Sequence, residues 1–395
     1  MALCIGAPAT GEHFFNRTVE KASLWKALEL NHLVLSAPRR LGKTSLLRYL
    51  EDTAADRGLF ARHIDASPCA NSGELVAAID NSFAEEGLRA HVRRVAHKTK
   101  DWISSTTQRI RRVNAANIGG VDLDPVQHRE ETWLKAFDAL ERRLGPEPVL
   151  IILDEFSVFL ERLLRHDLVQ AEILLSKLRR WRQRAGIPSR FVLTGSIGLN
   201  RLLERYGLGR ETNDCKDIPL GPFQPLHAIE MLIECARREG WPLDHAAAER
   251  LCRHVGWLSP FYLMLALDQS IYAAMERHNI DAGQGIPLET QDVDTGIARL
   301  LDTRSVFSDN YKRLDKHFDS TDLPTARSIL AHVCRSEKGA LSSTLSAKHT
   351  AHKELDDIFL VLEEHGYLAR EGERMTFQSP LLRAYWRRNH FHERT

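Results

Sequence analysis

The chain lacks the features that would assign it to a membrane or secreted class. No apolar run approaches the about 18 residues that a membrane-spanning helix needs. Met1–Gly11 has neither the basic start nor the long apolar core of a secretion signal. The six cysteines are scattered, with no CxxC pair and no Cys/His zinc spacing. We therefore expect a cytoplasmic protein with reduced cysteines and no transmembrane segment.

A strong net charge is also missing. The chain carries 54 Lys and Arg against 53 Asp and Glu, a formal net charge of +1. No overall field therefore steers it to nucleic acid or to a membrane, and such binding has to come from a local patch. There is no internal repeat and no low-complexity segment. The length of 395 residues predicts two or three domains.

Four short apolar runs alternate with amphipathic segments in the first half of the chain. Nearly continuous apolar runs are typical of parallel strands buried on both faces, and the segments between them have helical periodicity. The pattern predicts a three-layer, doubly wound α/β domain over residues 1–223. The predicted strands are His32–Ser36, Leu59–Ile64, Val149–Leu153 and Phe191–Thr194.

The second half of the chain is predicted to be mainly helical. A helical lid with a linker is expected over residues 224–320, with helices at Leu226–Glu239, Asp244–Val255 and Pro260–Arg277. Residues 321–395 have the order of a winged-helix domain, in which three helices precede a hairpin. The hairpin strands are predicted at Tyr367–Arg370 and Met375–Gln378, with Gly372 at the turn.

A phosphate-binding loop follows the first predicted strand. It has the form GxxxxGK[ST] with Ala in the first position, and its residues are Ala37, Pro38, Arg39, Arg40, Leu41, Gly42, Lys43, Thr44 and Ser45. In such a loop the backbone N–H groups and the following helix N-terminus bind phosphate oxygens. Lys43 is predicted to reach the β- and γ-phosphates and Thr44 to hold Mg²⁺. ATP and Mg²⁺ are therefore the predicted cofactors.

Two adjacent carboxylates end the third predicted strand, which is the Walker B arrangement. Asp154 is predicted to order Mg²⁺ through water, and Glu155 to polarise the attacking water. Thr194 or Ser196, at the end of the next strand, could sense the γ-phosphate. That strand is expected to lie between the strands that carry the loop and Asp154, which marks the ASCE class of P-loop ATPases. The chain is thus predicted to hydrolyse ATP.

These motifs together resemble the archaeal-type ATPase family, which belongs with the STAND NTPases and their AAA+ relatives. The resemblance covers nearly the whole chain and rests on the loop, the predicted winged helix, Gly11-Glu12-His13-Phe14-Phe15-Asn16-Arg17, Leu153-Asp154-Glu155-Phe156 and Leu193-Thr194-Gly195-Ser196. It implies that Arg17 lies near the nucleotide base or the sheet edge and that Pro260 packs by the adenine. Ser259 departs from the family's Gly-x-Pro element, which has Gly there. Arg210 resembles a Gly-Arg element that supplies either an arginine finger or a salt-bridged loop residue.

Two basic segments of the sequence each allow more than one interpretation of their function. Arg89–Arg112 holds eight basic residues and one acid, a net of +7, within a predicted helical insertion at about 87–128. It is either a solvated face packed on the ATPase core or a surface for nucleic-acid phosphates, an acidic partner or an anionic membrane. The cluster Arg179–Arg184 ends a predicted helix. It is either structural or acts in a neighbouring subunit, if the protein forms a nucleotide-dependent homo-oligomer.

Two functions compete on this basis. The resemblance implies a molecular switch with slow turnover, in which ATP holds the lid closed and a partner protein in a separate chain receives the output. The alternative is a DNA-associated AAA+ ATPase similar to origin-recognition or transposition regulators. The segment Lys353–His365 carries five acids among its charged residues, and residues 321–395 have a net charge of +1. We therefore expect this block to contact protein rather than DNA.

Overall fold

The computed structural model describes residues 3, 5–83, 125–195, 198–283, 285–302, 304–349 and 355–389. The chain divides into two compact units. The sheet unit comprises Thr18–Ser36 and Thr44–Pro219, and the helical unit comprises Met1–Arg17, Ala37–Lys43 and Leu220–Thr395. Most of the predicted basic insertion, including all of Arg89–Arg112, lies outside the described residues, as does Ser196. No helix in the described part of the chain is long and apolar enough to cross a membrane.

The sheet unit is built on five parallel strands in the order β2-β3-β4-β1-β5. Their bounds are β1 His32–Ser36, β2 Phe60–Asp65, β3 Val149–Asp154, β4 Arg190–Gly195 and β5 Cys215–Pro219. The four predicted strands are present, and β4 lies between β1 and β3 as expected for the ASCE class. β5 was not predicted because it is an edge strand in which no residue is fully buried, so its sequence lacks an apolar run.

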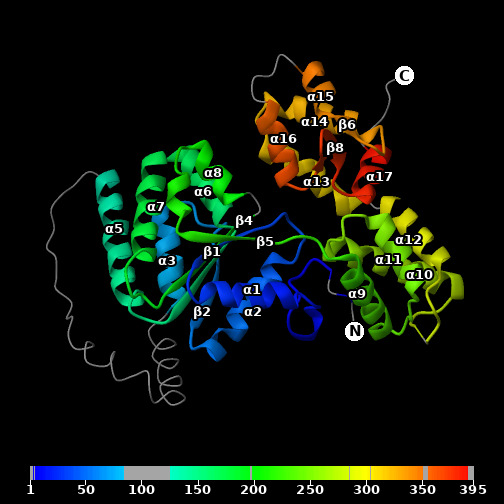
Figure 1. Ribbon diagram of the computed structural model, residues 1–395, viewed down its shortest axis with the longest axis horizontal. Coiled ribbons are helices and arrows are strands. Elements are labelled where there is room, and N and C mark those ends of the chain that lie inside the picture. Colours follow the sequence, from blue (N-terminus) through cyan, green and yellow to red (C-terminus); the bar gives the residue numbers. More distant parts are fainter. Residues whose placement is uncertain are drawn as a thin grey trace. The chain divides into compact units, whose positions relative to one another are not determined.

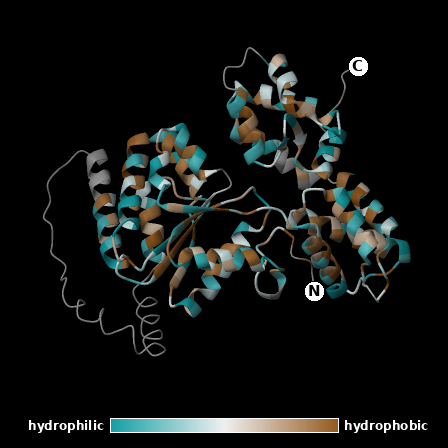
Figure 2. Cartoon of the chain, in the orientation of Figure 1, coloured by the Kyte–Doolittle hydropathy of each residue, from teal (hydrophilic) through white to brown (hydrophobic). Residues whose placement is uncertain are grey.

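Helices cover both faces of this sheet (Figure 1). α1 (Thr18–Leu28) and α2 (Lys43–Thr53) lie on one face. The opposite face carries α3 (Ser72–Ser82), α5 (Pro125–Leu144), α6 (Phe156–His166), α7 (Leu168–Arg182) and α8 (Leu199–Arg205). Figure 2 shows hydrophobic colours along the central strands and hydrophilic colours on the outward sides of the helices. The sheet unit is therefore a three-layer α/β structure.

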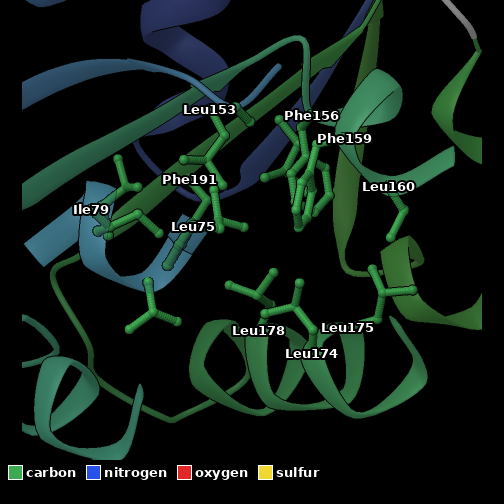
Figure 3. Packing of buried hydrophobic residues seen from close by; sticks show 14 of the residues in the cluster. Leu75, Ile79, Leu153, Phe156, Phe159, Leu160, Leu174, Leu175, Leu178 and Phe191 are labelled. Carbon is green, nitrogen blue, oxygen red and sulfur yellow. The ribbon is translucent and has the colours of Figure 1, made fainter. Parts of the chain in front are cut away.

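Its core fixes the strand ends at which the predicted site residues lie. Every residue of β3 is buried. Leu153 of β3 and Phe191 of β4 point toward leucines and phenylalanines of α3, α6 and α7 (Figure 3). The ring of Trp181 on α7 packs edge-on against Phe191 at 5.1 Å. Each fully buried side chain of this kind contributes about 1.5–3 kcal/mol, so the ends of β3 and β4 are held in a rigid frame.

The helical unit begins with η1 (Gly11–His13) and the loop, and continues with α9 (Pro225–Arg238), α10 (His245–Val255) and α11 (Pro260–His278). These three helices match their predicted bounds within one residue. α12 (Thr290–Asp302) and α13 (Arg304–His317) were not predicted. α12 packs closely along α11, since a Cβ at Gly296 would lie 2.5 Å from the backbone of Ser270.

The last part of the helical unit contains α14 (Asp322–Cys334), β6 (Ala340–Leu341), α15 (Ser342–Lys348), α16 (Leu355–Glu364), β7 (Leu368–Glu371), β8 (Arg374–Phe377) and α17 (Pro380–Asn389). The strands form an antiparallel sheet in the order β6-β8-β7. The predicted hairpin is present as β7 and β8, and Gly372 at its turn has φ of 61°. The sequence predicted the hairpin as the last element of this block, and α17 was not predicted. The winged-helix assignment itself stays a prediction.

Candidate functional site

A single carboxylate joins several elements of the sheet unit. Asp154, the last residue of β3, is 4% exposed. Its Oδ1 accepts hydrogen bonds from Oγ1 of Thr194 at 2.6 Å and from the backbone N of Glu155 at 2.9 Å. Its Oδ2 accepts from Oγ1 of Thr44 at 3.1 Å and lies 3.2 Å from Nε2 of His63. The ends of β3 and β4, the first turn of α2 and a histidine of β2 therefore meet at Asp154.

The sheet register explains this convergence. Parallel strands present their carboxyl ends at one edge, where ligands bind in open α/β sheets. Asp154 pairs with Asp65 of β2, and Thr194 pairs with Leu35 of β1. Glu155 follows in the left-handed region, with φ of 52° and ψ of 28°. Such a conformation costs about 1–2 kcal/mol in a non-glycine residue, and the bond from its N–H to Asp154 stabilises it. α6 begins at the next residue, so this tight turn sets the position of Glu155.

The loop Ala37–Lys43 belongs to the helical unit. Its backbone is left-handed at Arg40, with φ of 71°, and at Gly42, with φ of 86°. Arg17 supports it: Nη2 of Arg17 donates to the carbonyl of Leu41 at 3.1 Å and to the carbonyl of Gly221 at 2.8 Å. The Arg17 guanidinium also lies 4.5 Å from the ring centre of Phe223. The family resemblance implied that Arg17 lies near the nucleotide base or the sheet edge. Within the helical unit, its hydrogen bonds hold the loop.

Arg40 provides a second link between the loop and the helices. Its Nη1 donates to the hydroxyl of Tyr262 at 3.0 Å, and its guanidinium lies 4.3 Å from the ring centre of Phe261. The backbone carbonyl of Arg40 accepts a 2.6 Å bond from Oγ of Ser259. Pro260, the first residue of α11, comes between these contacts in the sequence. The loop is thus anchored to the N-terminus of α11, and the adenine contact of Pro260 stays a prediction.

Arg39 lies in a basic hollow of the helical unit. It lines this hollow with Arg313, His365 and Tyr367, among others. Burial, followed by the charges of His317, Arg39 and Arg313, lowers the pKa of His365 to about 2. A loop side chain therefore lines the same hollow as residues of the C-terminal elements of its own unit. Lys43 and Ser45 are both buried at the start of α2, and the phosphate-binding role of the loop residues stays a prediction.

Arg210 is exposed on the surface of the sheet unit, in η4 (Gly209–Thr212). Its Nε donates to Oε1 of Glu211 at 3.0 Å. It lines a groove together with Arg179, Arg180 and Arg184. Arg182 behaves differently, because it is buried and donates to both carboxylate oxygens of Asp214, at 2.7 and 3.0 Å. The Arg179–Arg184 cluster thus combines a structural residue with exposed ones, and the finger role of Arg210 stays a prediction.

The residues at Asp154 fit a magnesium ion. Magnesium prefers hard oxygen ligands such as the Thr44 hydroxyl and the Asp154 carboxylate, and it keeps several of its waters. Among the described residues, no group of three or more His, Cys, Asp and Glu side chains could by itself hold a metal ion. The nearby nitrogen of His63 was not predicted, because its neighbour in space depends on the pairing of β2 with β3.

Two solved structures share this architecture. A Walker-type ATPase of Pyrococcus abyssi matches with a TM-score of 0.64 at 16% identity, covering 98% of this chain and 100% of that one. The ORC2 protein of Aeropyrum pernix, solved as ADPNP–ADP complexes, matches with a TM-score of 0.57 at 15% identity, covering 95% and 94%. No family model and no curated protein matches the chain. At these identities the likeness shows the fold alone, the α/β fold that this chain shares with the two structures.

Proposed function

We propose that this chain is a magnesium-dependent ATPase that works as a molecular switch. One observation carries the proposal: the hydroxyl of Thr44, next to the loop lysine, donates to the carboxylate of Asp154 at 3.1 Å. P-loop NTPases hold Mg²⁺ with this pair of groups, a loop Ser or Thr and a Walker B Asp. The two groups come from α2 and β3, and the fold provides the strand ends that such a site needs.

Each residue has a distinct task in this reaction. The backbone N–H groups of Ala37–Lys43 and the ammonium group of Lys43 bind the phosphates. Thr44 and Asp154 would hold Mg²⁺, which offsets charge on the transferred phosphoryl group. The carboxylate of Glu155 orients the attacking water and accepts its proton. Thr194 fixes the carboxylate of Asp154 through its 2.6 Å bond, so it acts on the γ-phosphate site by way of Asp154.

The switch follows from the anchoring of the loop. Arg17, Arg40 and Ser259 tie the loop to residues around Gly221 and to the start of α11. A ligand that changes the loop conformation therefore changes these contacts too. ATP and ADP differ in the γ-phosphate, and the difference in their contacts sets how far the equilibrium between conformations can shift. A partner protein in a separate chain would read that shift.

Two substitutions test the proposal. Lys43→Ala removes the charge that meets the phosphates and should lower ATP affinity at least about a hundredfold. Glu155→Gln should keep ATP affinity and lower kcat about 10²–10³-fold, the range for loss of one catalytic group. The exposed residues Lys26 and Glu172 supply matched controls, Lys26→Ala and Glu172→Gln. Unchanged affinity in Lys43→Ala, or unchanged turnover in Glu155→Gln, would reject the corresponding assignment.

A second candidate function is that of a DNA-associated ATPase. The likeness to the ORC2 fold and the net charge of +7 in Arg89–Arg112 favour it. Phosphate contacts by several Lys and Arg residues would make such binding strongly dependent on salt. A DNA-associated ATPase would use the same ATP site as the proposed switch. The two functions differ only in the partner, protein or DNA, and a DNA-binding measurement distinguishes them.

A further inference from the structure

A histidine contacts the carboxylate at the centre of the proposed magnesium site. His63 lies on β2, and its side chain is 7% exposed. Its Nε2 is 3.2 Å from Oδ2 of Asp154, the same oxygen that accepts the hydroxyl of Thr44. A carboxylate oxygen accepts hydrogen bonds, so Nε2 carries the proton and donates. None of the motifs of the phosphate-binding loop or the acidic strand includes this residue.

The backbone of His63 is held from two sides. It pairs with Ile152 in the register between β2 and β3. Its N–H donates to Oε1 of Glu51 at 3.1 Å. Glu51 and Thr44 are seven residues apart on α2, which places them on one face of the helix. The His63 side chain can therefore change position mainly by rotating about its own bonds.

The hydrogen bonds on Asp154 define how its carboxylate is oriented. A carboxylate has two oxygens with about four lone-pair sites. Thr194 and the N–H of Glu155 donate to Oδ1, whereas Thr44 and His63 donate to Oδ2. Donors on both oxygens fix the plane of the group. Without His63, Oδ2 loses one of these two side-chain donors, and the carboxylate can rotate away from the direction that a magnesium-bound water needs.

We infer that His63 is a positioning residue for the magnesium-ordering carboxylate of Asp154. The inference rests on the proposed ATPase function. Groups that hydrogen-bond to a metal-binding carboxylate typically change metal affinity about 10- to 100-fold when they are removed. A purely structural histidine would change stability and leave the magnesium dependence of nucleotide binding intact. The two roles therefore differ in a measurable quantity.

The test compares His63→Leu with His63→Gln in the full chain. Leu fills similar space and has no donor, whereas the Gln amide places an N–H at nearly the reach of Nε2 and does not titrate. His166→Leu is the matched control, because His166 is exposed at the end of α6. The affinity for a fluorescent ATP analogue is measured as Mg²⁺ is titrated from zero, with the thermal midpoint of each variant as a measure of folding.

We expect His63→Leu to raise the half-saturating Mg²⁺ concentration about tenfold or more. Its affinity for the analogue in EDTA should stay within about twofold of wild type. His63→Gln should restore most of the magnesium response, and His166→Leu should match wild type. An unchanged or tighter magnesium response in His63→Leu would overturn the inference, and so would equal defects in the Leu and Gln variants.

Two further points keep the test decisive. If His63→Leu does not fold, His63→Gln is compared with His63→Asn, whose amide is one methylene shorter and does not reach Oδ2. A better magnesium response in Gln than in Asn supports the inference, and equal responses overturn it. If the wild type shows no magnesium-dependent ATP binding, the proposed function fails. If the wild type binds ATP in a magnesium-dependent way and the His63 variants need the same Mg²⁺ concentration as the wild type, only the role proposed for His63 is wrong.

Discussion

The hydroxyl of Ser259 donates a 2.6 Å hydrogen bond to the backbone carbonyl of Arg40. Ser259 is fully buried and directly precedes α11, whereas Arg40 lies in the loop with a left-handed backbone. The family resemblance leads one to expect glycine at position 259, and glycine could not make this bond. The departure from the family pattern therefore adds a direct link that holds a strained loop residue.

Ser259→Ala should loosen the loop. Loss of a buried hydrogen bond that leaves a carbonyl without its partner costs about 1–3 kcal/mol, and we expect ATP affinity to fall several-fold. Ser270→Ala is the matched control, because Ser270 is equally buried on α11 and donates to Ala266 at 2.8 Å, away from the loop. Both variants should lose stability, and only Ser259→Ala should lose affinity. Equal affinities in the two would contradict this role.

His32 should make stability depend on pH. Its Nδ1 accepts from the N–H of Phe191 at 3.2 Å, and its Nε2 lies 3.0 Å from the carbonyl of Arg182. The pKa of His32 is lowered from 6.5 to about 4, chiefly by burial, with the cations of Arg182 and Arg190 acting in the same direction and the Arg182 carbonyl and Asp214 opposing them. The unfolded chain therefore takes up the proton first. The contribution of neutral His32 to the free energy of unfolding is fully present above pH 6.5. It decreases as the pH drops toward 4, by up to about 3 kcal/mol.

Urea unfolding between pH 7.5 and 4.5 measures this effect. The chain has 18 histidines, so the relevant quantity is the difference in pH slope between the wild type and His32→Gln. Gln has a donor and an acceptor but does not titrate. We expect a flatter slope for the variant below pH 6.5. Parallel slopes would show that His32 does not contribute to the acid sensitivity.

Arg210 should control assembly if it acts across a subunit boundary. Its side chain is 74% exposed, so a neighbouring subunit could reach it. Light scattering of the Glu155→Gln protein should give a larger mass with ATP than without, and adding Arg210→Ala should abolish the increase. Arg205→Ala, an exposed residue at the end of α8, is the control. A mass that stays monomeric with and without ATP would leave Arg210 with a role within one chain.

DNA binding, if present, should depend on the basic insertion and not on the C-terminal hairpin. α16, the helix before the hairpin, has Asp356 and Asp357 in its first turn, where they would repel phosphates. Reversing Arg93, Arg94, Arg111 and Arg112 to Glu should remove binding and flatten its salt dependence. Reversing the exposed hairpin residues Arg370 and Arg374 should leave affinity nearly unchanged. The opposite result would place the DNA contact on the hairpin.

The sequence predicts best where burial dominates. β1 and β3 are nearly continuous apolar runs because both of their faces are covered, and their bounds were predicted within one residue. β5 is partly exposed and α13 is rich in polar residues, so neither has the pattern that prediction requires. Contacts such as His63 to Asp154 and Ser259 to Arg40 join residues 91 and 219 positions apart. They depend on strand register and packing, which no local pattern encodes.

The division of the chain has a consequence for synthesis on the ribosome. The loop is made early, but its partner Ser259 follows 219 residues later. At about 5–20 residues per second, about 10–40 seconds separate the two events. A nascent chain that ends before Ser259 has the loop and the strands of the sheet unit but not the groups that brace Arg40. Tight ATP binding should therefore be delayed until translation has passed this point, which limits premature use of ATP by incomplete chains.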